Sequence, residues 1–463
     1  MIDPPGAFYW PVGLGFAILC FAVNYPGRLT SDSLYSIITM ASHREIGNWH
    51  SATLGWLWSL PGPLLGQPAG ALLMQSAFFG LFAGFLPRTL ATFRGWLTLL
   101  LELVLRLSLV GAVGMIGKDV ITLIAMLIGV SLLRSVANAR FTYLRGVAVI
   151  ALLTLFLLVK APNFLVIVLA VAMILPFLGP SFKTYAGFVA ITLGLGVLAI
   201  PLNRTIDRSI FHAKDVHPDK QLVIFDLAAI SIGTGSNAFA RVQNWPTRQL
   251  PSVKSCFLPY MWDSFAPWAP CAGYSTAYDG LDSALKRAWV TAILTHPIVY
   301  ARHRLTYAGY LVQSRDYASW GIGGAAVNDA SSQAGKAEMD ALMAKFKADH
   351  PVQLWRATST ATPFRVLETA LWRFPKIQSV ALIGSLALLL FAWLGRRDGI
   401  RLAVLIPACL GLGNFGMLLV FGVADPARYL LPTVGLFYVA LLALLAPATP
   451  APFSGLRASP SND

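Results

Sequence analysis

The amino-acid sequence predicts an all-α polytopic membrane protein with about ten transmembrane helices and one extracytoplasmic soluble domain inserted between spans seven and eight. Three observations support this fold class. Apolar runs of about 20 residues, the length that crosses a bilayer as a helix, recur along the chain. Charged residues make up only 12% of the 463 residues and hydrophobic residues 56%, whereas a soluble domain is roughly one quarter charged. One long polar segment interrupts the pattern.

The apolar runs define the individual spans. We predict spans at 7–24, 69–86, 95–114, 119–135, 144–160, 162–180, 184–202, 376–394, 400–422 and 428–446. The stretch from Ser51 to Leu65 is also apolar, but it is short and Pro61, Gly62 and Pro63 interrupt it. We therefore expect a half-buried helix that leads into the second span, because a stretch of this length does not cross a bilayer.

The distribution of basic residues predicts which loops are cytoplasmic, because short cytoplasmic loops are enriched in Lys and Arg. With the N-terminus in the cytoplasm, the inner short loops hold one acid, Asp398, and the basic residues Arg88, Arg94, Arg134, Arg140, Arg145, Lys183, Arg396, Arg397 and Arg401. In the outer short segments the charges nearly cancel, with Arg28, Arg44, Lys118, Lys160 and Arg428 against Asp32, Glu45, Asp119 and Asp425. This asymmetry favours ten spans with a cytoplasmic N-terminus.

The same pattern divides the chain into four parts. Residues 1–202 form an N-terminal membrane module whose first outer loop is 25–68, and residues 376–446 form the C-terminal membrane helices. Residues 203–375, which we call the inserted segment, are expected to be extracytoplasmic. The tail 447–463 is rich in Pro, Ala and Ser and is predicted to be disordered. Cys256 and Cys271 in the inserted segment either form a disulfide or remain two thiols; spacing alone does not decide.

The net charge of +14, from 35 Lys and Arg against 21 Asp and Glu, suggests nucleic acid in a soluble protein, but here membrane topology explains it better. We find no nucleic-acid-binding signature and expect no nucleic-acid partner. The sequence has no HExxH motif, paired CxxC motif, P-loop or credible dinucleotide-binding fingerprint. No metal site is therefore predicted.

Ionisable residues at the ends of the outer connections are the candidate site residues, because charge beside hydrocarbon is costly and often marks a site. They are Asp32 and His50 in the first outer loop, Lys118 and Asp119 before the fourth span, Lys160 before the sixth span, and Arg428 with Tyr429 at the start of the last span.

Each Asp, Lys and Arg among these residues also has a structural explanation. Asp32 could cap a helix that begins near Leu34. Lys118 with Asp119 could be a local ion pair, and Lys160 could be an interfacial anchor. Arg428 could pair with Asp425.

Together, a carboxylate and three cations from separate loops suggest a general base beside an anion site. A carboxylate can deprotonate an acceptor hydroxyl, while lysine and arginine can bind a donor phosphate and stabilise the charge of the leaving group. Hydrophobic spans would supply a groove for a lipid tail. This chemistry suits the transfer of a group from a phosphate-linked lipid donor.

In this order the motifs resemble the GT-C superfamily of polytopic glycosyltransferases, within it the mannosyltransferase and aminoarabinose-transferase branch. Asp32 stands at the acidic position of the first outer loop, and Asp119 at a second acidic position that opens the fourth span. Two further motifs of the family are present: a Lys-x-Pro motif at Lys160, Ala161 and Pro162, and an Arg-Tyr-Leu-Leu-Pro motif from Arg428 to Pro432. The Lys-Pro-Pro motif of the family's first loop is absent here. The segment that surrounds this motif in the family is similar to the one formed here by Asn48, Trp49, His50, Ser51, Trp56, Trp58 and Gly66.

Other short sequence motifs resemble those of an uncharacterised bacterial subgroup. They are Pro26 and Gly27 before Asp32, the pair Trp49 and His50 after it, and His296, Pro297, Tyr300, His303, Arg304 and Leu305 in the inserted segment.

The resemblance implies roles for the candidate residues. Asp32 would be the general base, and Asp119 would orient the acceptor or a metal. Lys118, Lys160 and Arg428 would bind the donor phosphate, with His50 and Tyr429 as further substrate contacts. No cofactor is definite, and a divalent cation is the one candidate. The implied protein is a bacterial inner (plasma) membrane glycosyltransferase that moves a sugar from a polyprenyl-phosphate donor, in contact with membrane lipid, to an unidentified acceptor: a cell-envelope glycan, a lipid or a protein.

Two other functions remain open. A transporter or flippase of a lipid-linked anionic substrate would need charges at the bilayer midplane and, often, inverted repeats. Glu102 and Arg106 in the third span are the main candidates, and their spacing of one helical turn favours an intrahelical pair instead. An envelope assembly protein, anchored by its spans, would not need ionisable residues in four outer connections.

Overall fold

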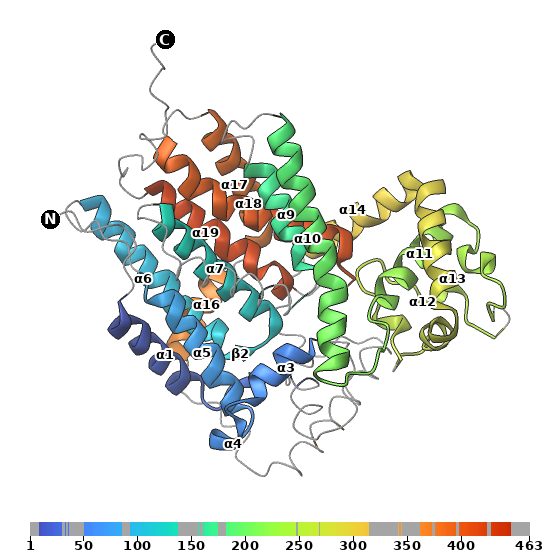
Figure 1. Cartoon of the computed structure of the whole chain (residues 1–463), viewed down its shortest axis with the longest axis horizontal. Helices are drawn as coiled ribbons and strands as arrows, with labels where there is room; N and C mark the ends of the chain where they lie inside the picture. Colours follow the sequence, from blue (N-terminus) through green and yellow to red (C-terminus); the bar gives the residue numbers. More distant parts are fainter. Residues whose placement is uncertain are drawn as a thin grey trace.

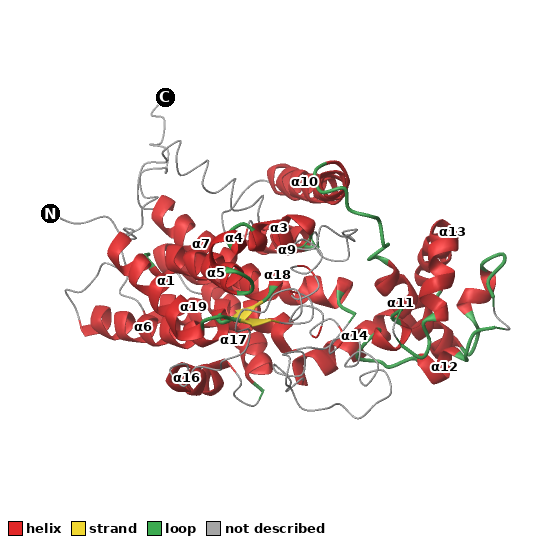
Figure 2. Cartoon of the chain, turned by 90° about the horizontal axis from the view of Figure 1, so that it is seen from below, coloured by secondary structure: helices red, strands yellow, loops and turns green. Residues whose placement is uncertain are grey.

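The computed structural model describes residues 9–29, 33, 36, 51–85, 93–137, 156, 160, 162–174, 182–246, 249–267, 269–313, 341, 344, 362–372, 376–394, 398–423 and 427–445. Helices account for most of this part of the chain, as Figures 1 and 2 show. Among the described residues, four helices are long and apolar enough to cross a membrane: Gly95–Val113, Tyr185–Ser209, Ile377–Leu394 and Ala403–Phe421. The prediction of a helical membrane protein is thereby confirmed at this level.

The N-terminal module contains α1 (Trp10–Asn24), α3 (Ala52–Ser59), α4 (Gly62–Leu65), α5 (Ala69–Ala83), α6 (Phe93–Val113), α7 (Lys118–Ala137), α9 (Asn163–Ile174) and α10 (Phe182–Ser209). Apart from α3 and α4, each begins within a few residues of a predicted span. The predicted span 144–160 lies outside the described residues except at Phe156 and Lys160. Helices α1, α5 and α9 are apolar but only 10–17 residues long, so the number of crossings stays a prediction.

Two short helices occupy the stretch expected to lead into the second span. The hydroxyl of Ser51 accepts the backbone N–H of Leu54 at 3.3 Å and caps the start of α3. The chain then turns at Leu60 and Pro61 and continues as α4. This arrangement confirms the predicted helix and its interruption at the prolines.

Close helix packing in the N-terminal module relies on small residues. A Cβ atom at Gly80 of α5 would lie 2.6 Å from the backbone oxygen of Gly13 in α1. Only glycine lets the two backbones approach this far, as in many membrane helix pairs. The buried side chains of α5, α6 and α7 form one core with those of the C-terminal helices.

The inserted segment ends with α16 (Thr362–Trp372). The C-terminal part that follows contains α17 (Ile377–Leu394), α18 (Asp398–Phe421), the 3-10 helix η5 (Ala427–Leu430) and α19 (Leu431–Leu445). Helix α18 packs against α9, α17 and α19 and brings the end of the chain beside its first half (Figure 1). The indole of Trp372 in α16 donates to the Ser108 hydroxyl of α6 at 2.8 Å.

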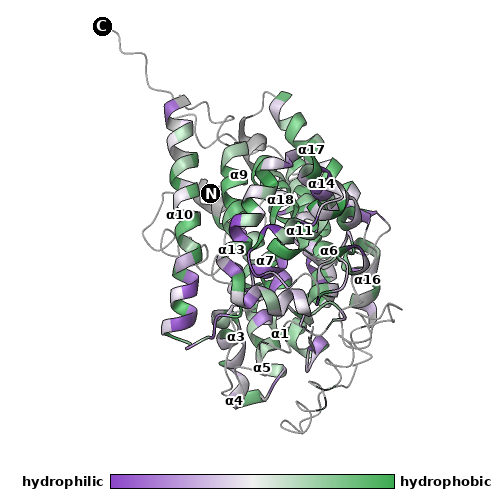
Figure 3. Cartoon of the chain, turned by 90° about the vertical axis from the view of Figure 1, so that its right-hand side faces the viewer, coloured by the Kyte–Doolittle hydropathy of each residue, from purple (hydrophilic) through white to green (hydrophobic). Residues whose placement is uncertain are grey.

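Helix α10 extends to Ser209, beyond the predicted span end at residue 202. Its apolar middle carries the exposed side chains Ile191, Val197 and Leu198, and Figure 3 shows hydrophilic colour at one end of the helix. Arg208 in the last turn is a favourable charge at a helix C-terminus. The helix thus continues past the end of the apolar run, into a stretch of charged residues.

The described part of the inserted segment is also helical. It contains α11 (Lys220–Thr234), η2 (Ala238–Arg241), α12 (Val253–Cys256), η3 (Asp263–Phe265), α13 (Gly273–Thr295) and α14 (Pro297–Gln313). Helix α13 ends before His296 and α14 begins at Pro297, because a proline cannot continue the preceding helix. Phe239 and Trp245 stack with ring centroids 5.0 Å apart and pack on Tyr274.

A disulfide joins Cys256 and Cys271, whose Cα atoms are 6.0 Å apart. This resolves the choice that spacing left open. Both half-cystines are buried in the core of the inserted segment, where the bond connects α12 to the start of α13. Cys20 and Cys409 are buried free thiols.

Removing this disulfide should destabilise the inserted segment. The bond spans 15 positions, and closing a loop of this length is worth about 3 kcal/mol in the chain-entropy account. We expect Cys256→Ala with Cys271→Ala to be cleaved faster than wild type between residues 203 and 313 in pulse proteolysis under urea. Cys409→Ala, which removes a buried thiol without a bond, is the matched control. A double variant as resistant as this control would contradict the prediction.

Candidate functional site

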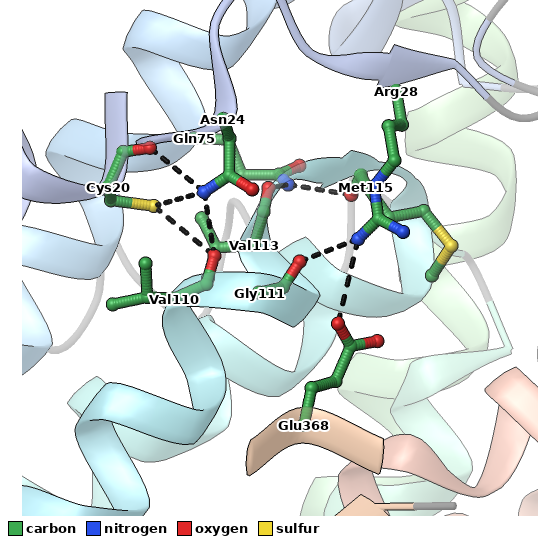
Figure 4. Close-up of polar contacts among 9 residues, drawn as sticks. All are labelled: Cys20, Asn24, Arg28, Gln75, Val110, Gly111, Val113, Met115 and Glu368. Carbon is green, nitrogen blue, oxygen red and sulfur yellow. Dashed lines mark hydrogen bonds and ion pairs between the residues drawn. The ribbon is translucent and has the colours of Figure 1, made fainter. Parts of the chain in front are cut away.

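The C-terminal end of α6 is held by hydrogen bonds from two neighbouring helices (Figure 4). The last carbonyls of a helix have no partner within it, and in an apolar bundle water does not replace them. The buried Asn24 side chain of α1 donates to Val110 O at 2.8 Å. The fully buried Gln75 of α5 donates to Val113 O and, at 2.8 Å, to Met115 O.

The chain after α1 completes this arrangement. The Arg28 backbone N–H donates to Gly114 O at 2.9 Å, and its guanidinium donates to Gly111 O at 2.7 Å. As a result β1 (Arg28–Leu29) pairs in parallel with β2 (Met115–Ile116), with Leu29 opposite Ile116. Gly27 has a φ of +106°, and a Cβ there would lie 2.7 Å from Ile116 Cδ1, so only glycine fits.

Arg28 also connects this junction to α16. Its guanidinium lies 3.7 Å from Glu368 Oε2 (Figure 4). Glu368 is buried and comes from the end of the inserted segment. From the sequence, Arg28 was recognised only as a charge of the outer segments. The start of the first outer loop is thus fixed by contacts to α6 and α16.

Three side chains from separate connections meet at the start of α7. Asp119 lies in the first turn of α7 and is 5% exposed. The ammonium of Lys160, just before α9, is 3.7 Å from Asp119 Oδ1 and 5.1 Å from the centre of the Tyr429 ring in η5. We call Asp119, Lys160 and Tyr429 the Asp119 cluster. It combines a carboxylate, a cation and an aromatic ring, and the cation–π geometry is favourable.

Hydrogen bonds to the backbone carbonyls of Lys160 and Tyr429 hold these two members of the cluster in place. The Asn163 N–H donates to Lys160 O at 2.8 Å at the start of α9. The buried Asn414 of α18 donates to Tyr429 O at 3.1 Å and to Thr433 Oγ1 at 3.1 Å. Asn414 was missed in the sequence, where one polar residue in an apolar span gave the only signal.

The inserted segment is bound to the chain just before η5. Arg304 of α14 donates to Gly422 O at 2.6 Å, and the Trp262 backbone N–H donates to Val423 O at 2.8 Å. Val423 precedes Tyr429 by six positions in the sequence. The inserted segment therefore helps to position the segment that leads to the Asp119 cluster.

A buried charged network supports this attachment. Asp226 of α11 is fully buried; it pairs with Arg304, lies 3.2 Å from His303 Nε2 and accepts the Trp289 indole N–H at 2.8 Å. Burial lowers the pKa of His303 and, together with Arg304, outweighs the opposing effect of Asp226. The attraction of Asp226 raises the pKa of Arg304 in spite of burial. The network is thus one ion pair with a neutral histidine.

The structure places some predicted residues in the cluster and leaves others untested. Asp119, Lys160 and Tyr429 come together, and Lys118 is the partly exposed first residue of α7. Arg428 lies in η5 next to Tyr429, with its side chain outside the described part. Asp32 and His50 lie outside the described residues.

The described residues include no group of three or more His, Cys, Asp or Glu side chains that could hold a metal ion. The chemistry of the Asp119 cluster is that of a charged pair: a lysine ammonium has three N–H donors and can bridge a carboxylate and a phosphate oxygen.

No protein-family model matches the chain, and comparisons with curated proteins and with solved structures find no similar protein.

The neutral His303 makes the attachment of the inserted segment pH-sensitive. Its pKa is lowered on folding, so below the ordinary value of about 6.5 the unfolded chain binds the proton more readily. Stability is fully present above that value and is lost as the pH falls, by at most about 1.4 kcal/mol per pH unit for one proton.

We therefore expect the free energy of unfolding to decrease from pH 7.5 to pH 5.0, and to decrease less in His303→Gln, which keeps a hydrogen-bond donor but does not titrate. Urea unfolding at both pH values measures this. Identical pH slopes in variant and wild type would contradict it.

Proposed function

We propose that the protein is an integral-membrane glycosyltransferase of GT-C type, which transfers a sugar from a polyprenyl-phosphate donor to an extracytoplasmic acceptor. The observation that carries the proposal is the Asp119 cluster, in which the ammonium of Lys160 lies against both a carboxylate and an aromatic ring that come from distant connections. A local ion pair between Lys118 and Asp119 or a lone interfacial lysine would not require this convergence.

The first outer loop begins beside the cluster. Leu29 pairs with Ile116, which precedes Lys118 by two positions, and Asp32 follows Leu29 by three positions. The chain order therefore supports placing the loop acid and the start of α7 in one site. A base and a phosphate-binding cation need this proximity to act on the same donor.

In the proposed reaction, Asp32 removes the proton from an acceptor hydroxyl as its oxygen bonds to the anomeric carbon of the sugar. The bond between that carbon and the phosphate oxygen breaks, and polyprenyl phosphate leaves with the electron pair. Lys118, Lys160 and Arg428 stabilise the phosphate charge, and Asp119 orients Lys160. Attack from the face opposite the phosphate inverts the anomeric configuration.

The transporter alternative has less support. Its main candidates for a charged path, Glu102 and Arg106, form an intrahelical ion pair at 3.0 Å. Arg106 also donates to Phe85 O at 2.5 Å. This pairing offers a structural explanation for both charges within α6.

The proposal includes a bacterial plasma-membrane location with ten spans, a cytoplasmic N-terminus and an extracytoplasmic inserted segment. Fusions test its sidedness: because α10 continues to Ser209, one junction belongs after His212 and the other after Arg397. We expect alkaline phosphatase to be active at the first junction and inactive at the second, with the reverse pattern for a fluorescent protein. Equal sidedness at the two junctions would rule the topology out.

Turnover of a polyprenyl-phosphate sugar by Asp32→Asn tests the function itself. Asparagine caps helices about as well as aspartate but is not a base. We expect turnover to fall by about 100- to 10,000-fold, the range of general-base catalysis, with thermal stability near wild type.

The matched control is Asp279→Asn, which changes a half-exposed carboxylate in the inserted segment. A folded Asp32→Asn protein with turnover equal to this control would remove the general base from the account and return the question to transport.

A further inference from the structure

A buried carboxylate with an unpaired oxygen lies near the C-terminal end of α10. Asp207 is 5% exposed, and its carboxylate accepts the backbone N–H of Ala52 at the start of α3. Its other oxygen, Oδ1, has no hydrogen-bond partner within the described part of the chain. Such an oxygen is costly to bury, so a ligand that donates a hydrogen bond to it would be bound favourably.

The neighbouring arginines pair with other carboxylates. Arg204 Nη2 is 3.7 Å from Asp219 Oδ1, and Arg208 pairs with Asp215. Asp219 also accepts Lys286 at 2.6 Å and the Tyr278 hydroxyl at 2.9 Å. The charges that flank Asp207 in the sequence are therefore used by these acids.

An aromatic pair lies four positions farther along both segments. Trp56 of α3 and Phe211, which follows α10, have ring centroids 6.1 Å apart. Trp56 is 42% exposed, so part of its ring can take a ligand. A carboxylate oxygen that accepts hydroxyl hydrogens, beside an open aromatic ring that packs on C–H groups, is a combination that suits a sugar ring.

Helix α5 packs against both α3 and α7 and so connects this pair to the region of the proposed reaction. The first outer loop leaves β1 beside the start of α7 and returns to α3, whose first N–H contacts Asp207. We infer that Asp207 and Trp56 form the subsite for the sugar ring of the polyprenyl-phosphate donor, an inference that rests on the proposed function. Asp207 accepts a sugar hydroxyl and Trp56 packs against the ring.

Lipid binding in nanodiscs tests this subsite without turnover. Native mass spectrometry compares the affinity for undecaprenyl phosphate with that for the same lipid carrying mannose, glucose or arabinose. We expect wild type to prefer at least one sugar-bearing lipid by about tenfold, the size of one hydrogen bond to a charged group. In Asp207→Asn the amide oxygen still accepts Ala52 N–H but the amide nitrogen replaces Oδ1, so the preference should disappear while undecaprenyl phosphate binds as before.

Trp56→Ala is a second variant on a partly exposed surface, and it should reduce the same preference. Asp279→Asn and Trp96→Ala, which change an exposed carboxylate and an exposed indole elsewhere, should retain it. A preference as large as that of wild type in either subsite variant, or its absence from wild type, overturns the inference. If undecaprenyl phosphate itself does not bind wild type, the proposed function fails, and the subsite with it.

Discussion

The site depends on one constraint: the carbonyl groups at the C-terminal end of α6 need hydrogen-bond donors inside an apolar bundle. Carbonyls at a helix C-terminus must find donors where water is scarce. Asn24, Gln75 and Arg28 supply them. Beside these bonds the Arg28 backbone N–H donates to Gly114 O, where β1 pairs with β2. One requirement of the backbone thus fixes where the first outer loop leaves the bundle and where α7 begins. Asn24 or Gln75 replaced by an apolar residue would leave buried carbonyls unpaired.

Two further sets of hydrogen bonds fix the chain segment that carries Tyr429 of the Asp119 cluster. Asn414 holds the Tyr429 backbone from within the bundle. Arg304 and Trp262 bind the carbonyls of Gly422 and Val423 from the inserted segment. The inserted segment thus shares its buried charge network with the segment that leads to the proposed donor site.

Helix positions were predictable because they follow from local hydropathy, and the break at His296 because proline ends helices locally. Candidate residues at loop ends were predictable by residue type, and the structure joins Asp119, Lys160 and Tyr429. The ion pairs that support these residues could not be predicted. Arg28 pairs with Glu368 and Arg304 with Asp226, and these partners lie far apart in the sequence, where no periodicity encodes a pairing. Asp207 was missed because α10 extends beyond its apolar run. Asp32 and His50 remain predictions.

The most direct test of the account is the affinity of Lys160→Met for undecaprenyl phosphate. Methionine keeps the apolar stem and removes the ammonium that lies between Asp119 and Tyr429. Loss of one charge-assisted phosphate contact predicts an affinity about 10- to 100-fold weaker than wild type, whereas Lys286→Met, which changes a paired lysine of the inserted segment, should bind normally. An unchanged affinity in folded Lys160→Met protein would contradict the assignment of the Asp119 cluster as a phosphate site.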